Sequence, residues 1–380
     1  MITFNFRYLS IIKFSFICLS ITMTQYTIAQ NAQNFPNWKT DTSNHLVPIS
    51  EFKSLLPRDA IVPIDSPKFV SIHEADTMYF EREPFIVVRD DGPARAYPLS
   101  VLMWHEIVND QLSDKKIVIT YCPLCNAALV FGRERPWKGK HLIMDFGTSG
   151  MLRKSDLVMW DRQTESWWQQ IEGKALVGTL AGASLERIPS QVLSFQEFKS
   201  AYPDGIILSN QTGLNYKYGS NPYISYDDTG NLKPRLFDEN VDPRLPAMER
   251  VIAIDIEGNR RAYPWSTIQK MGIIQETYAN RDIVVFYQQG AISVLDQSII
   301  QNSHKIGSAT VFSPKIEGKL LHFVKVTDGF QDAETKSLWN ISGQCVSGPY
   351  KDAQLESYFY TSHFAFAYLE FFPDTGIYKN

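Results

Sequence analysis

Short apolar runs separated by turn residues dominate this chain. Val, Ile, Leu and aromatic residues are concentrated at residues 85–89, 116–121, 127–132 and 156–161. Runs of about four to eight such residues between Gly, Pro, Asn or Asp signals are typical of β-strands. Shorter runs at 61–64 and 141–146 add two more expected strands, so the pattern predicts a strand-rich fold.

Two segments of the first half show helical spacing instead. After Pro98, apolar residues recur three and four positions apart as far as Val108, which predicts a helix over this stretch. Residues 195–202 predict a second helix, because Ser194 is a favourable N-cap and Pro-Asp-Gly follows. A comparable C-terminal helix is expected around residues 364–371.

The same pattern occurs twice along the chain. Arg-Ala-Tyr-Pro at 95–98 recurs at 261–264, and the strand-like residues 117–121 recur at 283–287 with the same spacing. An Asp, Thr, Ser and Trp series also recurs: Asp161, Thr164, Ser166 and Trp168 correspond to Asp332, Thr335, Ser337 and Trp339. A repeat this long indicates duplicated lobes and excludes a short-repeat solenoid. The predicted fold is α+β, strand-dominated, with two pseudo-symmetric duplicated lobes.

The repeat sets the expected domain boundaries. Residues 1–30 are predicted to be a signal peptide and 31–64 a polar leader. Lobe one covers 65–210 and lobe two 248–380. The connection at 211–247 is rich in Asn, Tyr, Asp, Pro and Gly, has no copy in lobe two, and is expected to form one wall of a cleft.

Lobe one has a cysteine pair that lobe two lacks. Cys122 and Cys125 are separated by Pro-Leu, and at the spacing of the repeat they correspond to Gln288 and Ala291. The second lobe therefore shows that the fold forms without the pair. We interpret Cys122 and Cys125 as chemistry added to a scaffold, at the tip of a predicted strand–turn–strand.

Other differences between the lobes concern one histidine and one insertion. His105 corresponds to Met271, and lobe one has extra residues within 147–160, predicted to be an added Gly/Ser-containing loop. Arg153 and Lys154 in that loop would favour a thiolate if they lay beside the cysteines. The alternative for His105 and Glu106 is that they form only the exposed end of a helix. Asp161 is retained in both lobes and is interpreted as a turn residue.

Composition limits the classes of function. The formal net charge is −4 and no basic stripe is present, which argues against nucleic-acid binding. Arg7 and Lys13 are the only charges before an apolar run that ends near a small-residue site at Ala29, as in a secretory signal peptide. A retained anchor is the alternative. No later segment is long and apolar enough to span a membrane, so the mature chain is expected to be periplasmic or extracellular.

Export would place the cysteines in an oxidising compartment. Removal of the signal leaves Cys122, Cys125 and Cys345, an odd number, so at least one thiol is free, metal-bound or paired between molecules. Cys345 is expected to be buried and inert. A disulfide between Cys122 and Cys125 would close a very small loop and contribute little stability.

A metal is the other chemistry that the pair permits. Cys122 and Cys125 with His105 would give three ligands and an open position. Met159 or Met151 could add a soft fourth ligand, which would suit copper as a cofactor. A closed site of four cysteines is excluded because the chain has only one such pair.

Several motifs resemble a bacterial and archaeal family catalogued only as a domain of unknown function. They are Trp-His-Glu-Ile-Val-Asn-Asp at 104–110, Thr-Tyr-Cys-Pro-Leu-Cys at 120–125, and Ser-Asp-Leu-Val-Met-Trp-Asp-Arg-Gln-Thr at 155–164. Some members of that family are described as selenoproteins. The resemblance implies redox or soft-metal work at a thiol position, which in this chain means Cys122 or Cys125.

Three functions follow as hypotheses. The first is an exported redox protein in which Cys122 and Cys125 perform thiol–disulfide or peroxide chemistry with His105 as an auxiliary base. Its partner would be an unidentified small molecule or redox protein. The second is a copper-binding or electron-transfer protein that uses the same residues with Met159. The third is a non-enzymatic binding protein with a structural disulfide and an aromatic connection as its binding surface.

Overall fold

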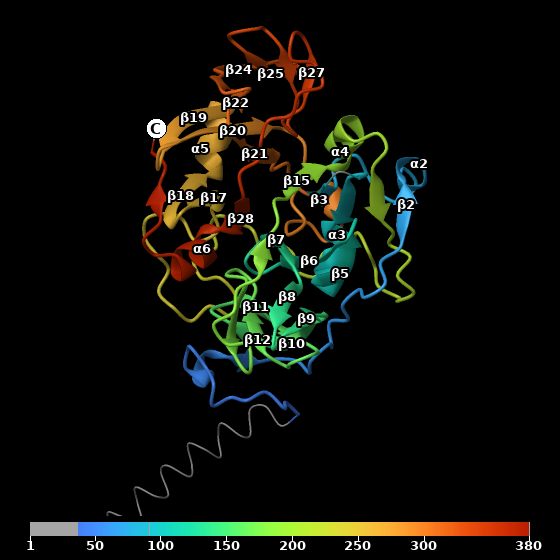
Figure 1. The fold of residues 1–380 in the computed structure, drawn as a ribbon, viewed down its shortest axis with the longest axis vertical. Coiled ribbons are helices and arrows are strands. Elements are labelled where there is room, and N and C mark those ends of the chain that lie inside the picture. Colours follow the sequence, from blue (N-terminus) through green and yellow to red (C-terminus); the bar gives the residue numbers. More distant parts are fainter. Residues whose placement is uncertain (1–36, 91, 380) are drawn as a thin grey trace, which may run out of the picture.

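The computed structural model describes residues 37–90 and 92–379. The predicted signal peptide lies outside these residues. Within them the protein is strand-dominated, with short helices at the margins of several sheets (Figure 1). The predicted α+β class is therefore confirmed.

A mixed sheet occurs in each half of the chain, with the same order over four strands and one extra strand, β2, in the first half. The order is β15-β3-β4-β16-β2 in the first half and β28-β17-β18-β29 in the second. In both, the last strand of the half joins in parallel: β16 to β4 and β29 to β18. The strands of these sheets are β2 (Phe69–Ser71), β3 (Pro84–Val88), β4 (Arg95–Pro98), β15 (Gln191–Ser194), β16 (Ile206–Leu208), β17 (Arg250–Ile256), β18 (Asn259–Pro264), β28 (Tyr360–Phe364) and β29 (Gly376–Ile377).

The remaining sheets also correspond between the halves. An antiparallel sheet β14-β7-β6-β5 corresponds to β19-β20-β21, and β1-β10-β11-β12-β13 corresponds to β24-β25-β26-β27. The strands of the first pair are β5 (Ile107–Leu112), β6 (Lys115–Cys122), β7 (Ala127–Gly132), β14 (Glu186–Arg187), β19 (Ile273–Tyr278), β20 (Arg281–Gln288) and β21 (Ser308–Phe312). Those of the second pair are β1 (Lys53–Ser54), β10 (Phe146–Arg153), β11 (Asp156–Asp161), β12 (Trp167–Gln169), β13 (Lys174–Val177), β24 (Phe323–Val326), β25 (Gly329–Asp332), β26 (Leu338–Trp339) and β27 (Cys345–Ser347). Two small hairpins complete the sheets: β8 (Glu134–Trp137) with β9 (Lys140–Ile143), and β22 (Lys315–Ile316) with β23 (Lys319–Leu320).

The helices are all short. They are α2 (Ile72–Ala75), α3 (Leu99–His105), α4 (Phe195–Ala201), α5 (Trp265–Met271) and α6 (Ala365–Phe371), with 3₁₀ turns η1 (Ile49–Glu51) and η2 (Ile300–Asn302). Ser194 and Glu197 form the capping box that starts α4, as the sequence predicts for Ser194. In the part of the chain that the structure describes, no helix reaches the length and apolarity of a membrane span.

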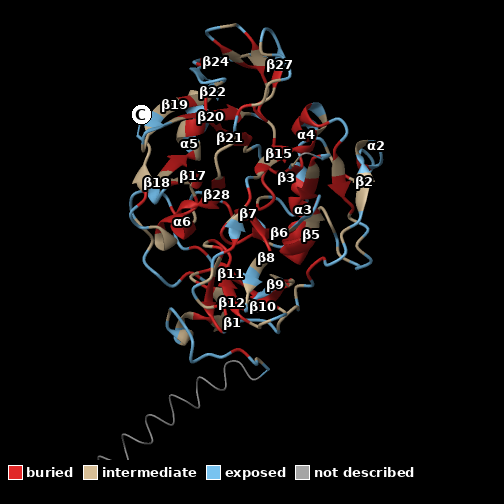
Figure 2. Cartoon of the chain, in the orientation of Figure 1, coloured by how far each residue is buried: buried red, intermediate tan, exposed pale blue. Residues whose placement is uncertain are grey.

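The two halves share one hydrophobic core. A single buried cluster contains residues of both, for example Phe85 and Phe364. Strand β28 packs beside β7 and β15 beside β21, so the sheets of the two halves contact each other (Figure 1). Figure 2 shows these four strands as almost entirely buried. The repeated order of elements agrees with the internal similarity in the sequence, while the predicted lobes as separate domains stay a prediction.

The repeated Asp residues stabilise equivalent turns. The carboxylate of Asp161 accepts hydrogen bonds from the Thr164 amide at 2.7 Å and the Trp168 indole at 2.9 Å. Asp332 accepts the same two bonds from Thr335 and Trp339, at 2.6 and 2.9 Å. This supports the interpretation of Asp161 as a residue of the fold.

Four local predictions need correction. Residues 61–64 form no strand, and only Ile64 makes an isolated bridge. Residues 141–146 are divided between the end of β9 and the start of β10. The expected loop at 147–160 is instead the β10–β11 hairpin. The helix predicted to reach Val108 ends at His105, because Glu106 adopts a left-handed backbone with φ of 57°.

Candidate functional site

The cysteine pair lies at the tip of the β6–β7 hairpin. Cys122 is the last residue of β6 and pairs with Ala127, and Cys125 lies in the turn between them. Asn126 follows with φ of 51°, a left-handed conformation that Asn tolerates better than most residues. Both cysteines are buried, and both are free thiols. The predicted strand–turn–strand is confirmed, and the structural disulfide of the third hypothesis is not formed here.

A second hairpin, β10–β11, brings a carbonyl group to the thiols. Its two turn residues, Lys154 and Ser155, have φ of 52° and 66°, as a tight two-residue turn of type I′ requires. The Ser155 carbonyl accepts a hydrogen bond from the Cys125 thiol at 3.3 Å and a longer one from Cys122 at 3.9 Å. The segment that the sequence marks as an insertion therefore closes over the pair.

Asp156, the next residue, completes a cluster of three ligand-type groups. A carboxylate oxygen of Asp156 and the two sulfur atoms all lie within 4.8 Å of one another. Its Oδ2 accepts hydrogen bonds from the Gln169 amide at 2.6 Å and the Ile171 backbone at 3.0 Å. Its buried Oδ1 has no hydrogen-bond partner among the described residues. Burial raises the pKa of Asp156 to about 7.

Glu106 is placed beside this cluster by a strained helix end. It terminates α3 with φ of 57°, and its amide donates to the Leu102 carbonyl at 2.7 Å. The equivalent of Glu106 in the second half is Gly272, with φ of 72° and the same hydrogen bond to Ile268 at 2.8 Å. Glycine adopts this conformation freely, whereas a side chain there costs on the order of 1–2 kcal/mol. The first half thus keeps a carboxyl group where the fold alone favours glycine.

Glu106 is a buried residue whose side chain lines a pocket described below. The residue is only 8% exposed. Burial, and secondarily the neighbouring Asp156, raise the pKa of Glu106 to about 8. The expectation that His105 and Glu106 form an exposed helix end is therefore wrong.

The surroundings of the thiols disfavour the thiolate. Burial raises the pKa of Cys122 and raises that of Cys125 well above its usual value, and Asp156 adds to both shifts. The two cations that could have favoured a thiolate are paired with other residues, since Arg153 contacts Glu51 and Lys154 contacts Glu370.

His105 has other partners. Its Nδ1 lies 2.6 Å from the Val62 carbonyl oxygen and its Nε2 lies 2.6 Å from the Tyr218 hydroxyl. Because a carbonyl only accepts, Nδ1–H donates to Val62 and Nε2 accepts from Tyr218. With both nitrogens occupied, His105 joins α3 to the connection and forms no hydrogen bond with Cys122 or Cys125.

The two methionines are also buried away from solvent. Met159 lies fully buried on β11 within the main core. Met151 lines a pocket described below. The structure thus groups Cys122 and Cys125 with Asp156, in the position for which the sequence suggested His105 or a methionine.

Sequence reasoning missed Asp156 and Glu106 as site residues. At the spacing of the repeat, Glu106 corresponds to Gly272 and Asp156 to Thr327. The same comparison that singled out the cysteines could therefore have found both carboxylates.

The connection between the halves covers the site. The Tyr226 hydroxyl donates to the Leu124 carbonyl at 2.9 Å, and the Ser155 hydroxyl donates to the Arg235 carbonyl at 2.8 Å. A buried ion pair of 2.6 Å between Asp227 and Arg250 fixes the connection to the second half. These contacts make the connection one wall of the site.

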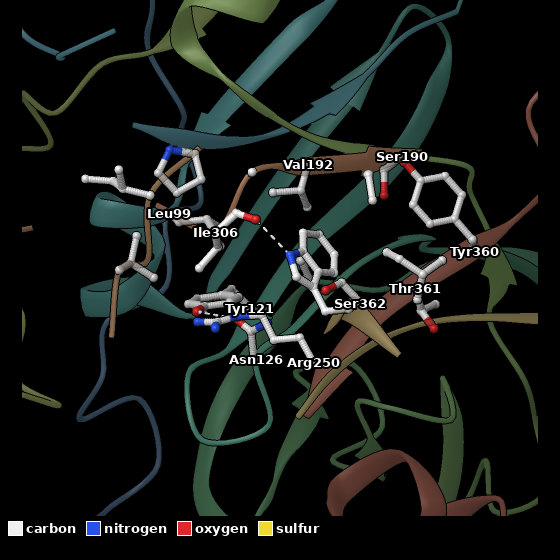
Figure 3. Close-up of a pocket in the computed structure, with 18 residues that line it drawn as sticks. Leu99, Tyr121, Asn126, Ser190, Val192, Arg250, Ile306, Tyr360, Thr361 and Ser362 are labelled. Atoms are coloured by element: carbon white, nitrogen blue, oxygen red, sulfur yellow. Dashed lines mark hydrogen bonds between the residues drawn. The ribbon is translucent and has the colours of Figure 1, made fainter. Parts of the chain in front are cut away.

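Two cavities of very different size flank the cysteine hairpin. On one side a small cavity of about 40 Å³ lies between the halves, with Tyr121, Asn126 and Arg250 at one end (Figure 3). This space suits a few water molecules at most. On the other side a pocket of about 610 Å³ is lined by Glu106 and Leu124, among others. Its size is that of a small-molecule site.

A second cluster of ligand-type groups is already satisfied. Asp227, Asp296 and His304 lie close enough to hold a cation. The Oδ2 of Asp227, however, already accepts from Arg250 at 2.6 Å and from Ser293 at 2.5 Å. The adjacent guanidinium supplies the positive charge that a cation would bring.

Comparison with curated proteins gives no match, and comparison with solved structures gives none either. A family model described as protein of unknown function (DUF3179) matches residues 58–375, which is most of the chain and includes both hairpins of the site. The resemblance noted in the motifs is confirmed, and the chain belongs to this family.

Proposed function

We propose that the chain is an exported metal-binding protein whose Cys122, Cys125 and Asp156 hold one thiophilic divalent ion, with Zn²⁺ as the best fit. The observation that carries this proposal is the cluster of two sulfurs and one carboxylate oxygen within 4.8 Å, with Asp156 Oδ1 buried and unpartnered. Ligand atoms around a tetrahedral Zn²⁺ are roughly 3.3–3.8 Å apart, given bonds of about 2.0–2.3 Å. Small side-chain shifts would suffice to close the site.

Electrostatics supports a cation. Two thiols and two carboxyl groups are buried together. The cations of the adjacent hairpin, Arg153 and Lys154, pair with Glu51 and Glu370 instead. A divalent ion would neutralise ligands that are otherwise costly to ionise and would release their protons. Zinc accepts both thiolate and carboxylate ligands, whereas Cu(I), the copper ion suited to two thiolates, prefers sulfur ligands throughout. The carboxylate of Asp156 therefore favours zinc over the copper expected from sequence.

Three protein ligands would leave one coordination position free. Glu106 and Leu124 line the pocket of about 610 Å³ beside the cluster. Sites with three protein ligands and one open position are typical of catalytic zinc, and closed sets of four are typical of structural zinc. The arrangement therefore favours a reactive centre over a purely structural one.

Thiol-based redox chemistry is the second candidate. The observation that favours it is the adjacent pair of free thiols at a hairpin tip. One thiolate would attack a substrate disulfide and release one substrate thiol, and the second cysteine would then displace the other thiol. The protein would be oxidised to a disulfide, the substrate would be reduced to two thiols, and the two protein protons would pass to them. The raised thiol pKa values would make the attack slow.

Metal analysis of the mature chain tests the first proposal. Protein purified without chelators, and then equilibrated with Zn²⁺, should hold about one ion per chain. The Cys122→Ser/Cys125→Ser double variant and Asp156→Asn should lose it. Cys345→Ser is the matched control, because it removes a buried free thiol of the second half.

The outcomes separate the candidates. Stoichiometric copper in place of zinc would correct the metal. Failure of wild type to retain any added metal would refute the proposal, and rapid thiol–disulfide exchange in the same metal-free protein would establish the redox candidate.

A further inference from the structure

Two consecutive glutamines, Gln169 and Gln170, contact the cluster and its cysteine hairpin from the end of β12. Both side chains are fully buried. At the spacing of the repeat they correspond to Asn340 and Ile341, so the second half forms the same turn with a shorter amide and an apolar side chain. The comparison between the halves that singled out the cysteines therefore marks this pair of glutamines as well.

Gln169 fixes the carboxylate of Asp156. Its Nε2 donates to Asp156 Oδ2 at 2.6 Å, and the Ile171 backbone amide donates to the same oxygen at 3.0 Å. Two donors thus occupy Oδ2, whereas the buried Oδ1 has no hydrogen-bond partner in the described part of the chain. Asp156 is held so that Oδ1 is the oxygen left for a metal ion, as a ligand of one atom.

Arg153 sets the orientation of the Gln169 amide. Its Nη1 donates to Gln169 Oε1 at 3.4 Å, and its Nε donates to Glu51 at 2.7 Å. A guanidinium only donates hydrogen bonds, so Oε1 of Gln169 faces Arg153 and its NH₂ group faces Asp156. Arg153, which the sequence suggested as a partner of the thiols, thus acts on the cluster through Gln169.

Gln170 fixes the cysteine hairpin. Its Nε2 donates to Thr120 Oγ1 at 2.8 Å and to the Ala127 carbonyl at 3.1 Å. Ala127 pairs with Cys122 across the hairpin, and Thr120 lies two residues before it on β6. One side chain therefore holds both strands of the hairpin immediately beside the cysteine pair.

This polar contact is a further difference between the halves. At the spacing of the repeat, Thr120 and Gln170 correspond to Phe286 and Ile341, which are both buried and apolar. In the first half, Gln170 Oε1 is buried without a hydrogen-bond partner among the residues described. An unpaired buried acceptor is unfavourable, so the first half keeps an amide where the fold alone favours an apolar side chain.

We propose that Gln169 and Gln170 are the positioning residues of the metal site, one directing Asp156 Oδ1 and the other the cysteine hairpin toward the same point. Because the two glutamines are consecutive, one short backbone segment sets the separation of the two hairpins that carry the ligands. This inference rests on the proposed function and identifies the residues on which its metal affinity depends. Removal of outer partners of this kind typically weakens metal binding about 10–100-fold.

Competition for Zn²⁺ with a chromogenic chelator tests these roles in the mature chain. Gln169→Leu and Gln170→Ile should each weaken Zn²⁺ binding about tenfold or more. Gln170→Ile introduces the residue that the second half carries at this position, so the variant is expected to fold. Asn340→Leu is the matched control, because the Asn340 side chain accepts hydrogen bonds from two backbone amides of the equivalent turn. It should leave Zn²⁺ affinity unchanged.

A spectroscopic measurement separates positioning from a general loss of stability. The visible absorption of Co²⁺ bound in place of Zn²⁺ reports the number and geometry of its ligands. Saturated Gln169→Leu should give a spectrum different from that of wild type, because Asp156 is no longer held by the amide. Asn340→Leu should keep the wild-type spectrum even if its free energy of unfolding falls by as much.

The outcomes distinguish this inference from the metal proposal. If wild type retains Zn²⁺ and either glutamine variant binds it as tightly, the inference is overturned and the metal proposal stands. An equal loss of affinity in Asn340→Leu would also overturn the inference, since the effect would then be one of general stability. Wild type that retains no added metal would overturn both.

Discussion

Glu106 should lower the free energy of unfolding relative to variants that carry Gln or Gly at this position. Replacement by Gln keeps the shape of the side chain but removes its ionisation. Replacement by Gly, the residue at the equivalent position 272, also removes the left-handed strain at φ of 57°. We therefore expect both variants to be more stable than wild type at alkaline pH, in contrast to most substitutions of buried residues.

The size of this pH-dependent stability difference follows from the pKa of Glu106. Burial raises the pKa of Glu106 from 4.5 to about 8, a shift of about 3.5 units. At roughly 1.4 kcal/mol per unit this corresponds to at most about 5 kcal/mol. The folded pKa is the higher one, so the folded state binds the proton more tightly. The stability contributed by Glu106 is therefore fully present below pH 4.5 and is lost as the pH rises to about 8.

Urea unfolding at pH 5 and pH 8.5, with a chelator present, measures this effect. The advantage of Glu106→Gln over wild type should grow by about 2–5 kcal/mol between the two pH values. Glu106→Gly should add about 1 kcal/mol at both, because the strain does not titrate. An advantage of Glu106→Gln that stays constant with pH would refute the assignment of a carboxyl group whose pKa is raised by burial.

Three further predictions concern the scaffold. Burial raises the pKa of Glu83 to about 8, so Glu83→Gln should gain stability relative to wild type as the pH rises from 4.5 to 8, measured by the same unfolding assay. Asp227→Asn should lower the unfolding free energy by about 3 kcal/mol, because it leaves Arg250 buried without its charge partner; a loss below 0.5 kcal/mol would contradict the role of this pair in fixing the connection. Gly150→Ala should lower the thermal midpoint by several degrees, since φ is +73° and the added Cβ would lie 2.1 Å from the Leu56 carbonyl; an unchanged midpoint would contradict the close packing of the leader on β10.

The hairpin that carries the cysteine pair could be predicted from the sequence pattern. The β-branched and apolar runs on each side of Cys122 and Cys125 predicted the hairpin, and the structure forms it as β6 and β7. Strand propensity and turn chemistry act over a few residues, so sequence pattern suffices for such an element. The Ser194 cap of α4 was predicted for the same reason.

The predicted C-terminal end of α3 was wrong because the backbone conformation of one residue ends the helix although the apolar spacing continues. Ile107 and Val108 continue the helical spacing of α3, yet they begin β5. The left-handed residue between them and the helix is Glu106, whose side chain gives no signal for this conformation. In the second half Gly272 gives that signal plainly, since glycine is the usual residue at a helix end of this kind.

The sequence by itself determined the strand-rich class, the repeated pattern, the family and the cysteine pair as the chemical difference between the halves. Only the tertiary structure decided which side chains surround that pair. Asp156 reaches the thiols through a hairpin more than thirty residues away, and His105, nearer in sequence, is held by Val62 and Tyr218 instead. Which side chains converge depends on strand register and on packing between the halves, and these long-range contacts leave no trace in local propensity.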